Sequence, residues 1–205
     1  MGEPALILVT GTPGTGKSII SRLLAEELGC AHVESSTLLV EGKAAARDPT
    51  GRDTMIIVED KARKVIRGFI ESSRGACYVV STLHPSLWLE TLGENVALVI
   101  LLRSDPRILM ERLSERGWGR AKILENVLSE AFNTIAEELL EWGDCVLEVE
   151  TSYKEPRLVL EEVFEKLEAW SVGISIDWMS VNPEIVEFVT RLVHELDLYK
   201  EGLGV

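Results

Sequence analysis

Short apolar runs alternate along the chain with longer segments in which apolar residues recur every three or four positions. Three of the runs are rich in strand formers, at residues 5–10, 76–81 and 96–102, and residues 145–149 are consistent with a fourth. Runs of this kind are typical of strands buried on both faces, as in a parallel sheet covered by helices. The pattern over residues 5–149 therefore predicts buried strands separated by helices.

The segments between the runs carry helical spacing. The pattern predicts helices over residues 17–28, 54–73, 105–116, 120–142 and 155–170, with a break at the Gly-Trp-Gly of residues 117–119. Residues 38–40 suggest a short helix and residues 48–51 a turn. Between the runs at residues 76–81 and 96–102 we expect an irregular segment that holds His84, Pro85 and Trp88. Strands that alternate with helices predict an α/β fold with a mainly parallel sheet and right-handed crossovers.

Residues 171–205 follow after this alternation is complete. A helix expected from Pro183 to about Lys200 has one apolar face: Ile185, Phe188, Val189, Leu192, Val193 and Leu196. Such a face is explained by docking on the protein's own core or by binding a partner, and the sequence leaves both interpretations open. We expect one domain over residues 1–170 and a helical extension over residues 171–205.

Composition narrows the functional classes. The 205 residues are 46% hydrophobic and 27% charged, and 21 basic against 34 acidic residues give a net charge of −13. This charge disfavours a broad nucleic-acid or anionic-membrane footprint, so neither direct DNA binding nor a membrane partner is expected. Cys30, Cys77 and Cys145 match no metal spacing and cannot all pair, which favours a reducing, cytoplasmic setting.

The strongest chemical signal is the sequence Gly-Thr-Pro-Gly-Thr-Gly-Lys-Ser at residues 11–18, between the first strand and the first helix. It satisfies G-x-x-x-x-G-K-[ST], in which glycines let backbone N–H groups converge on phosphate oxygens. The Lys17 ammonium can reach the β- and γ-phosphates of a nucleotide, and the Ser18 hydroxyl is a natural ligand for Mg²⁺. The motif predicts nucleoside triphosphate binding with Mg²⁺.

An arginine-bearing stretch is the second candidate: Arg103, Arg107, Arg112, Arg116 and Arg120. Arg112 and Arg116 are four residues apart and share one helix face. Arginines that close over a transferring phosphoryl group stabilise its charge, and the Gly-Trp-Gly break could act as a hinge. A solvated basic helix face explains the same spacing, so both interpretations stay open.

Together these motifs resemble one branch of the adenylate kinases, the small archaeal and eukaryotic nuclear type with adenylate kinase and ATPase activity. After the glycine loop, residues 113–118 (L-S-E-R-G-W), 122–126 (K-I-L-E-N) and 130–132 (E-A-F) are similar to that branch's lid pattern, R-G-[YF] followed by K-x-x-x-N and E-[IA]-F. The resemblance extends from Ala5 to about Trp170, includes residues 58–61, and leaves out the tail.

The resemblance implies a P-loop fold of the nucleoside monophosphate kinase type, with a five-stranded, mainly parallel sheet flanked by helices and a small lid at about residues 115–125. It implies MgATP as phosphate donor and AMP as the expected acceptor, bound along residues 34–57. Implied catalytic residues are Lys17, Arg112, Arg116 and His84. Implied contacts are Gly14, Thr15, Gly16, Lys17, Ser18, Ile19 and Arg116 for ATP, Ser18 for the metal, and Glu34, Leu38 and Glu59 for the monophosphate.

The chain departs from the branch at the end of its third strand. The branch carries Asp-x-His there, whereas this chain has Ser81 at the Asp position and His84 displaced by one residue. A serine can hold a metal-bound water but brings no negative charge, so slower turnover or a substitute carboxylate is expected. His84 is either a catalytic, water-positioning group or a structural loop histidine.

Two functions of different classes follow from the resemblance. The first is phosphoryl transfer from MgATP to a nucleoside monophosphate, by positioning and electrostatics and without a covalent intermediate. The second is a non-kinase assembly factor, in which ATP binding and hydrolysis time the release of a basic small-subunit ribosomal protein. Ser81 and the tail favour the second function, and the lid motif favours the first. A small-metabolite kinase explains the Arg-Gly-Trp segment less well.

Overall fold

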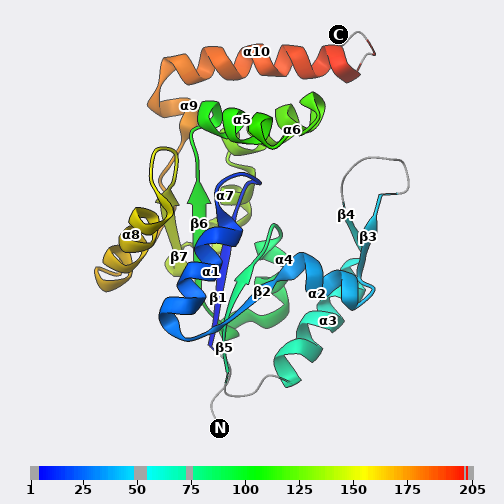
Figure 1. The fold of residues 1–205 in the computed structure, drawn as a ribbon, viewed down its shortest axis with the longest axis vertical. Helices are drawn as coiled ribbons and strands as arrows, with labels where there is room; N and C mark the ends of the chain where they lie inside the picture. Colours follow the sequence, from blue (N-terminus) through cyan, green and yellow to red (C-terminus); the bar gives the residue numbers. More distant parts are fainter. Residues whose placement is uncertain (1–4, 49–54, 73–75, 201, 203–205) are drawn as a thin grey trace. The chain divides into compact units, whose positions relative to one another are not determined.

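A five-stranded sheet organises the fold, with the strand order β2-β5-β1-β6-β7 (Figure 1). The computed structural model describes residues 5–48, 55–72, 76–200 and 202. The strands are β1 (Ala5–Gly11), β2 (Ala31–Glu34), β5 (Cys77–Ser81), β6 (Val96–Arg103) and β7 (Val146–Glu150). β5 pairs in parallel with both β1 and β2. The predicted α/β class with a mainly parallel sheet is confirmed.

The chain forms two compact units. The first lies within residues 1–10 and 18–100, and the second within residues 11–17 and 101–205. The segment after residue 170 thus shares a unit with residues 101–170, while the division into domains at about residue 170 stays a prediction.

The first unit contains α1 (Lys17–Leu28), α2 (Ser35–Glu41), α3 (Glu59–Ser72), α4 (Pro85–Leu92), a 3₁₀ turn (Gly93–Asn95) and a hairpin of β3 (Ala45–Arg47) with β4 (Met55–Ile57). The helix predicted from residue 54 begins only at Glu59, because Met55–Ile57 pairs with Ala45–Arg47 instead. Residues 49–51 of the predicted turn lie outside the described residues.

The prediction of an irregular segment between β5 and β6 is wrong, because α4 begins at Pro85 and occupies most of that segment. Pro85 occupies the first turn, where a missing N–H costs nothing, and Trp88 is fully buried with its Nε1 donating to Ser35 Oγ at 3.0 Å. Eight residues are too few for a periodic pattern to stand out. The hydrophobic pattern did not predict β2, because its four residues mix polar and apolar side chains at the edge of the sheet.

The second unit contains α5 (Pro106–Glu115), α6 (Arg120–Ala131), α7 (Thr134–Glu138), a 3₁₀ segment (Leu140–Cys145), β7, α8 (Pro156–Glu168), α9 (Trp178–Val181) and α10 (Pro183–Lys200). The single helix predicted over residues 120–142 is broken at Asn133, whose φ is 58°. Asn tolerates this left-handed conformation. Its side chain accepts from Arg103 and donates to Asp177 Oδ1 at 3.3 Å, which holds the break in place.

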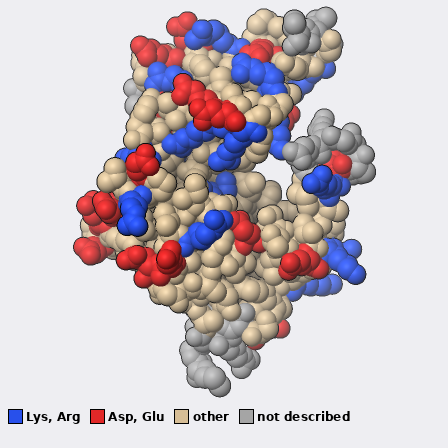
Figure 2. All heavy atoms as spheres, viewed as in Figure 1, with Lys and Arg blue, Asp and Glu red and all other residues tan. Residues whose placement is uncertain are grey.

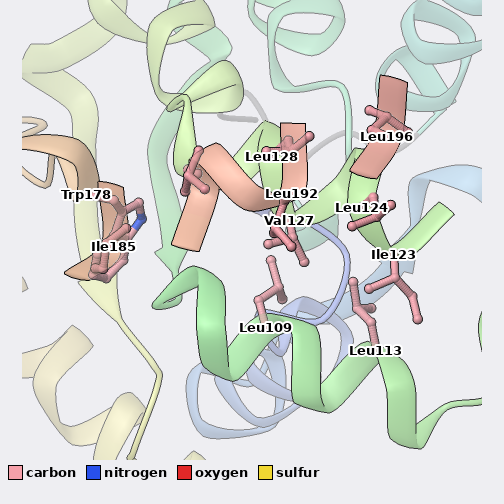
Figure 3. Packing of buried hydrophobic residues seen from close by; sticks show 12 residues of the cluster. Leu109, Leu113, Ile123, Leu124, Val127, Leu128, Trp178, Ile185, Leu192 and Leu196 are labelled. Atoms are coloured by element: carbon pink, nitrogen blue, oxygen red, sulfur yellow. The ribbon is translucent and has the colours of Figure 1, made fainter. Parts of the chain in front are cut away.

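The tail packs on its own unit. Ile185, Val189, Leu192 and Leu196 of α10 are buried in one cluster with residues of α5 and α6, and Figure 3 shows the labelled side chains of the three helices pointing toward one another. Arg120 adds a paired contact to Glu195, with N···O distances of 2.6 and 2.8 Å. Of the two interpretations of the apolar face, docking on the protein's own core is therefore the one that the structure supports.

The cysteine expectation needs correction. Cys30 and Cys77 form a disulfide, with Cα atoms 4.8 Å apart, and Cys145 is free. The pairing follows from the sheet, because Ala31 lies opposite Tyr78 and the two preceding cysteines therefore meet. The number of cysteines thus gives no support for a reducing setting. Burial, with a contribution from Asp144, raises the pKa of the Cys145 thiol.

None of the helices in the described ranges is long and apolar enough to cross a lipid bilayer.

The disulfide should stabilise the protein, because it closes a long loop in the unfolded chain. Its cysteines are 47 residues apart, for which chain entropy gives about 4 kcal/mol as an upper value. We expect Cys30→Ala combined with Cys77→Ala to lower the free energy of unfolding by about 2–4 kcal/mol in urea denaturation. Cys145→Ala is the control and should change little. Identical unfolding of the wild type with and without reductant would contradict the assignment.

Candidate active site

The loop between β1 and α1 is shaped by glycines that no other residue could replace. Gly11, Gly14 and Gly16 have φ values of 136°, 100° and 100°. A Cβ atom on Gly11 would lie 2.2 Å from Leu102 O, and one on Gly14 would lie 2.6 Å from Leu109 Cδ1. The positive φ angles and the close approach of neighbouring chain explain why the motif needs glycine at these positions.

Several carbonyl groups of this loop accept hydrogen bonds from residues of the second unit, to which the loop belongs. Lys17 Nζ donates to Gly11 O at 2.6 Å. The Thr151 hydroxyl is shared between Thr15 O at 3.1 Å and Arg103 O at 2.9 Å. Thr15 donates to Thr12 O through its N–H at 3.2 Å and its hydroxyl at 2.9 Å. Because the peptide unit is planar, anchoring Thr15 O turns the N–H of Gly16 in the opposite direction. Peptide units oriented in this way form an anion-binding concavity.

Arg112 supports the same loop from α5. Its guanidinium donates to Thr151 O at 2.6 Å, to Ser152 O at 2.7 Å and to Gly14 O at 3.4 Å. Burial lowers the pKa of Arg112, the charge of Arg116 adds to the effect, and Glu150 opposes it. Its contacts thus go to main-chain carbonyl groups beside the loop and to Thr151 Oγ1 at 3.3 Å. Arg116, by contrast, lies at the exposed C-terminal end of α5, where its backbone N–H donates to Ser114 O.

A buried carboxylate also holds the loop. Glu130 Oε2 accepts from Thr12 Oγ1 at 2.6 Å. Its Oε1 accepts from three donors, Arg103 Nε at 2.8 Å, Ser104 N at 3.1 Å and Trp178 Nε1 at 3.0 Å. Glu130 is 3% exposed. The sequence contained this residue only as part of the E-A-F motif, and neither spacing nor periodicity pointed to Thr12 as its partner.

Arg103 connects that carboxylate to the tail. Its Nη1 donates to Glu148 Oε1 at 2.8 Å, and Glu148 Oε2 accepts from the N–H groups of Ser175 at 2.6 Å and Ile176 at 2.9 Å. Arg103 is 1% exposed. It is therefore a structural group, and the hypothesis of a lid role does not apply to it. Arg107 and Arg120 are likewise engaged, with Asp105 and Glu195 respectively.

The first unit carries a separate pocket with two of the predicted residues. Its lining residues are Met55, Ile57, Glu59, Arg63, His84, Ser86, Leu87 and Glu90. Arg63 forms ion pairs through Nη2, with Glu90 Oε2 at 2.5 Å and with Glu59 Oε2 at 3.7 Å. The hydrogen bond to Glu90 raises the pKa of Arg63. His84 begins α4, with its N–H donating to Thr82 Oγ1 at 3.1 Å. Sequence analysis missed Arg63, although its position one helical turn after Glu59 was a usable signal.

Glu34 and Leu38 line another hollow of the first unit, together with His32, Val33, Thr37 and Glu41. The residues expected to contact a monophosphate are thus divided between this hollow and the pocket that contains Glu59.

Ser18 and Ile19 lie in the first turn of α1 with exposed side chains. Within residues 5–48, 55–72 and 76–200, no three His, Cys, Asp or Glu side chains are grouped so that they could hold a metal ion by themselves.

A glycine loop with anchored carbonyl groups, between the first strand of a parallel sheet and a helix, defines the class of P-loop phosphate-binding proteins. Residues 7–133 match the family model described as an AAA domain. Two solved structures share the fold: a gluconokinase from Sinorhizobium meliloti (17% identity, TM-score 0.56, covering 83% of this chain and 95% of that one) and a shikimate kinase from Acinetobacter baumannii (16%, 0.58, 80% and 93%).

Curated relatives extend over nearly the whole chain. Proteins named "Putative adenylate kinase" are 32% identical over 97% of this chain in Sulfurisphaera tokodaii and 36% identical over 90% in Thermococcus gammatolerans, in each case over 98% of the relative. The first alignment continues beyond Trp170, where the motif resemblance ended. The chain belongs to this adenylate kinase-like family of P-loop kinases.

The Glu130 network should matter for stability as well as for the loop. Replacing Glu130 by Gln leaves the buried Arg103 with one carboxylate partner fewer, and breaking a buried ion pair costs about 3–5 kcal/mol. We expect Glu130→Gln to lower the free energy of unfolding by that amount in urea denaturation. Glu125→Gln, on an exposed position of the same helix, should change it by less than about 0.5 kcal/mol. Equal effects of the two substitutions would contradict the structural role of the network.

Proposed function

We propose that the protein transfers the terminal phosphate of MgATP to a nucleoside monophosphate, with AMP as the preferred acceptor. The observation that carries the proposal is the glycine loop, in which the carbonyl groups of Gly11, Gly14 and Thr15 accept hydrogen bonds from the protein, so that its peptide units suit a polyphosphate. The names of the archaeal relatives support a nucleotide as the acceptor.

Donor binding rests on the loop and the residues that follow it. Gly14, Thr15 and Gly16 offer backbone groups to the phosphates, and Lys17 supplies a positive charge that can exchange its bond to Gly11 O for a phosphate oxygen. Ser18 and Ile19 continue the contacts into α1, and Arg116 contacts ATP from the segment at residues 115–125. We assign Arg112 to positioning the loop, because its contacts are with carbonyl groups of Gly14, Thr151 and Ser152.

Acceptor binding is assigned to the first unit. Glu59 and His84 line one pocket with Arg63, the guanidinium that a monophosphate dianion would attract. Arg63 is paired with Glu90 and Glu59, so binding of a phosphate would exchange one anionic partner for another. Glu34 and Leu38 line a second hollow of the same unit. To His84, which lines the pocket with Arg63, we assign the ordering of the acceptor or of a water molecule.

The chemistry requires positioning and charge stabilisation. Bound Mg²⁺ supplies positive charge that neutralises the phosphate oxygens. Lys17 and Arg116 stabilise the charge that spreads over the transferring group, and the loop N–H groups hold the donor in line. No side chain needs to become phosphorylated. We expect the protein to work in the cytoplasm, where ATP and nucleoside monophosphates are available.

A second function is favoured by Ser81. A hydroxyl at this position gives Mg²⁺ no negative charge, which suits slow ATP hydrolysis by an assembly factor that releases a basic ribosomal protein. The net charge of −13 would attract such a partner. In Figure 2, however, the surface of α8 shows acidic and basic side chains interspersed, consistent with the pairing of Glu162 with Lys154 and Lys166. We therefore rank this function second.

The decisive assay measures ADP production from ATP with and without AMP, CMP, GMP and UMP. We expect AMP to stimulate turnover most, and Lys17→Ala to reduce it by about 100-fold or more, because one charge contact to the transferring group is lost. Lys64→Ala, on an exposed position of α3, is the control and should retain activity. Turnover that none of the four monophosphates stimulates would exclude the kinase function and leave ATP hydrolysis.

The two arginines of α5 should differ in their kinetic effects. Arg112→Lys loses the branched contacts to three carbonyl groups, so we expect ATP binding to weaken by about 10-fold or more. Arg116→Lys should lower kcat and leave the Kd for ATP nearly unchanged. Isothermal titration and steady-state kinetics separate the two effects. The assignment is wrong if both variants change the same parameter by the same factor.

A further inference from the structure

The end of β5 lacks the acidic residue that a P-loop enzyme normally uses to organise its metal ion. In this class Mg²⁺ is held by the loop Ser or Thr and by an Asp at the end of another strand. Here the strand ends at Ser81, which is 4% exposed and carries no charge. A carboxylate that takes over this role must lie close to Ser81.

The strand register identifies such a carboxylate. β2 and β5 are parallel neighbours, and Glu34, the last residue of β2, lies directly opposite Ser81. Register partners in neighbouring strands project to the same face of a sheet, at a strand spacing of about 4.8 Å. Both residues also end their strands, so they lie at the carboxyl edge of the sheet.

Glu34 and Ser81 project to the face of the sheet that α1 covers. Ser21 of α1 is 2.9 Å from His32 through Oγ and Nε2. His32 and Glu34 are two residues apart on β2 and therefore point to the same side. His32 Nε2 is also 3.6 Å from Glu34 Oε1, which agrees with this placement. Glu34 thus projects toward α1.

The direction of α1 brings Ser18 toward the same edge. α1 follows β1 after the glycine loop and runs back along the sheet, so its first residues lie at the carboxyl edge. Ser18 is three residues before Ser21 on the same helix face, about 4.5 Å nearer to the helix start. Glu34 is about 6.6 Å farther than His32 along β2, toward the same edge. The contact between Ser21 and His32 therefore aligns Ser18 with Glu34.

We propose that Glu34 is the carboxylate that organises the nucleotide's Mg²⁺ in this protein, in place of an acid at residue 81. The proposal rests on the proposed function. Two hydroxyl groups and one carboxylate suit Mg²⁺, which keeps several waters and takes few protein ligands when phosphates supply the others. The side chain of Glu34 is 31% exposed, so a metal-bound water can reach it. This role replaces the expected contact of Glu34 with the monophosphate.

The test uses Mn²⁺ as a paramagnetic probe and adenylyl imidodiphosphate as a non-hydrolysable nucleotide. Electron paramagnetic resonance measures free Mn²⁺ in the presence of the protein–nucleotide complex. We expect Glu34→Gln to weaken Mn²⁺ binding by about 10-fold or more, the size of effect seen when a supporting metal contact is lost. Glu41→Gln, in the same hollow, is the matched control and should bind Mn²⁺ as the wild type does.

A second variant makes the test specific. Glu34→Gln combined with Ser81→Asp returns a carboxylate to the same face of the neighbouring strand, and we expect it to recover most of the lost Mn²⁺ affinity. Circular dichroism checks that each variant is folded. Unchanged Mn²⁺ affinity in Glu34→Gln, with a raised KM for the monophosphate, would overturn the proposal and return Glu34 to acceptor binding. Failure of the wild type to bind the nucleotide at all would instead refute the proposed function.

Discussion

The second unit depends on the ion pairs that the buried guanidinium of Arg103 forms. This guanidinium lies between two carboxylates, Glu130 and Glu148, and all three side chains are almost completely excluded from solvent. One positive charge does not balance two negative ones, so N–H and O–H donors supply the rest: Ser104, Trp178, Ser175 and Ile176, with Thr12 from the glycine loop. Removing Arg103 would leave two carboxylates buried without a positive partner, and removing either carboxylate would break one buried ion pair.

This arrangement relates the tail to the glycine loop. Trp178 and Thr12 are bound to the two oxygens of the same carboxylate, and the apolar face of α10 covers α5 and α6. The tail is thus part of the support of the loop, although the motif resemblance ends at about Trp170. The long alignment with the Sulfurisphaera relative agrees with this conclusion.

Sequence patterns were informative where a signal is local. The buried runs predicted four strands, and the helix at residues 17–28 and the motif at residues 11–18 follow from periodicity and spacing alone. What they missed depends on contacts between distant segments. Asn133 breaks a helix because Arg103 binds it, Met55–Ile57 is a strand because Ala45–Arg47 pairs with it, and Glu34 comes to lie beside Ser81 only through the register of β2 and β5. No spacing along the chain encodes these neighbours.

The disulfide has a geometric consequence besides its contribution to stability. β2 is an edge strand of four residues, and so short a strand with mixed polarity specifies its pairing weakly. A slip by one residue would turn the Glu34 carboxylate to the opposite face of the sheet, away from α1. The bond between Cys30 and Cys77 sits at the start of both strands and ties them one step before Ala31 and Tyr78 pair. A covalent link at one end of the strands therefore determines which side chain stands next to Ser81 at the other.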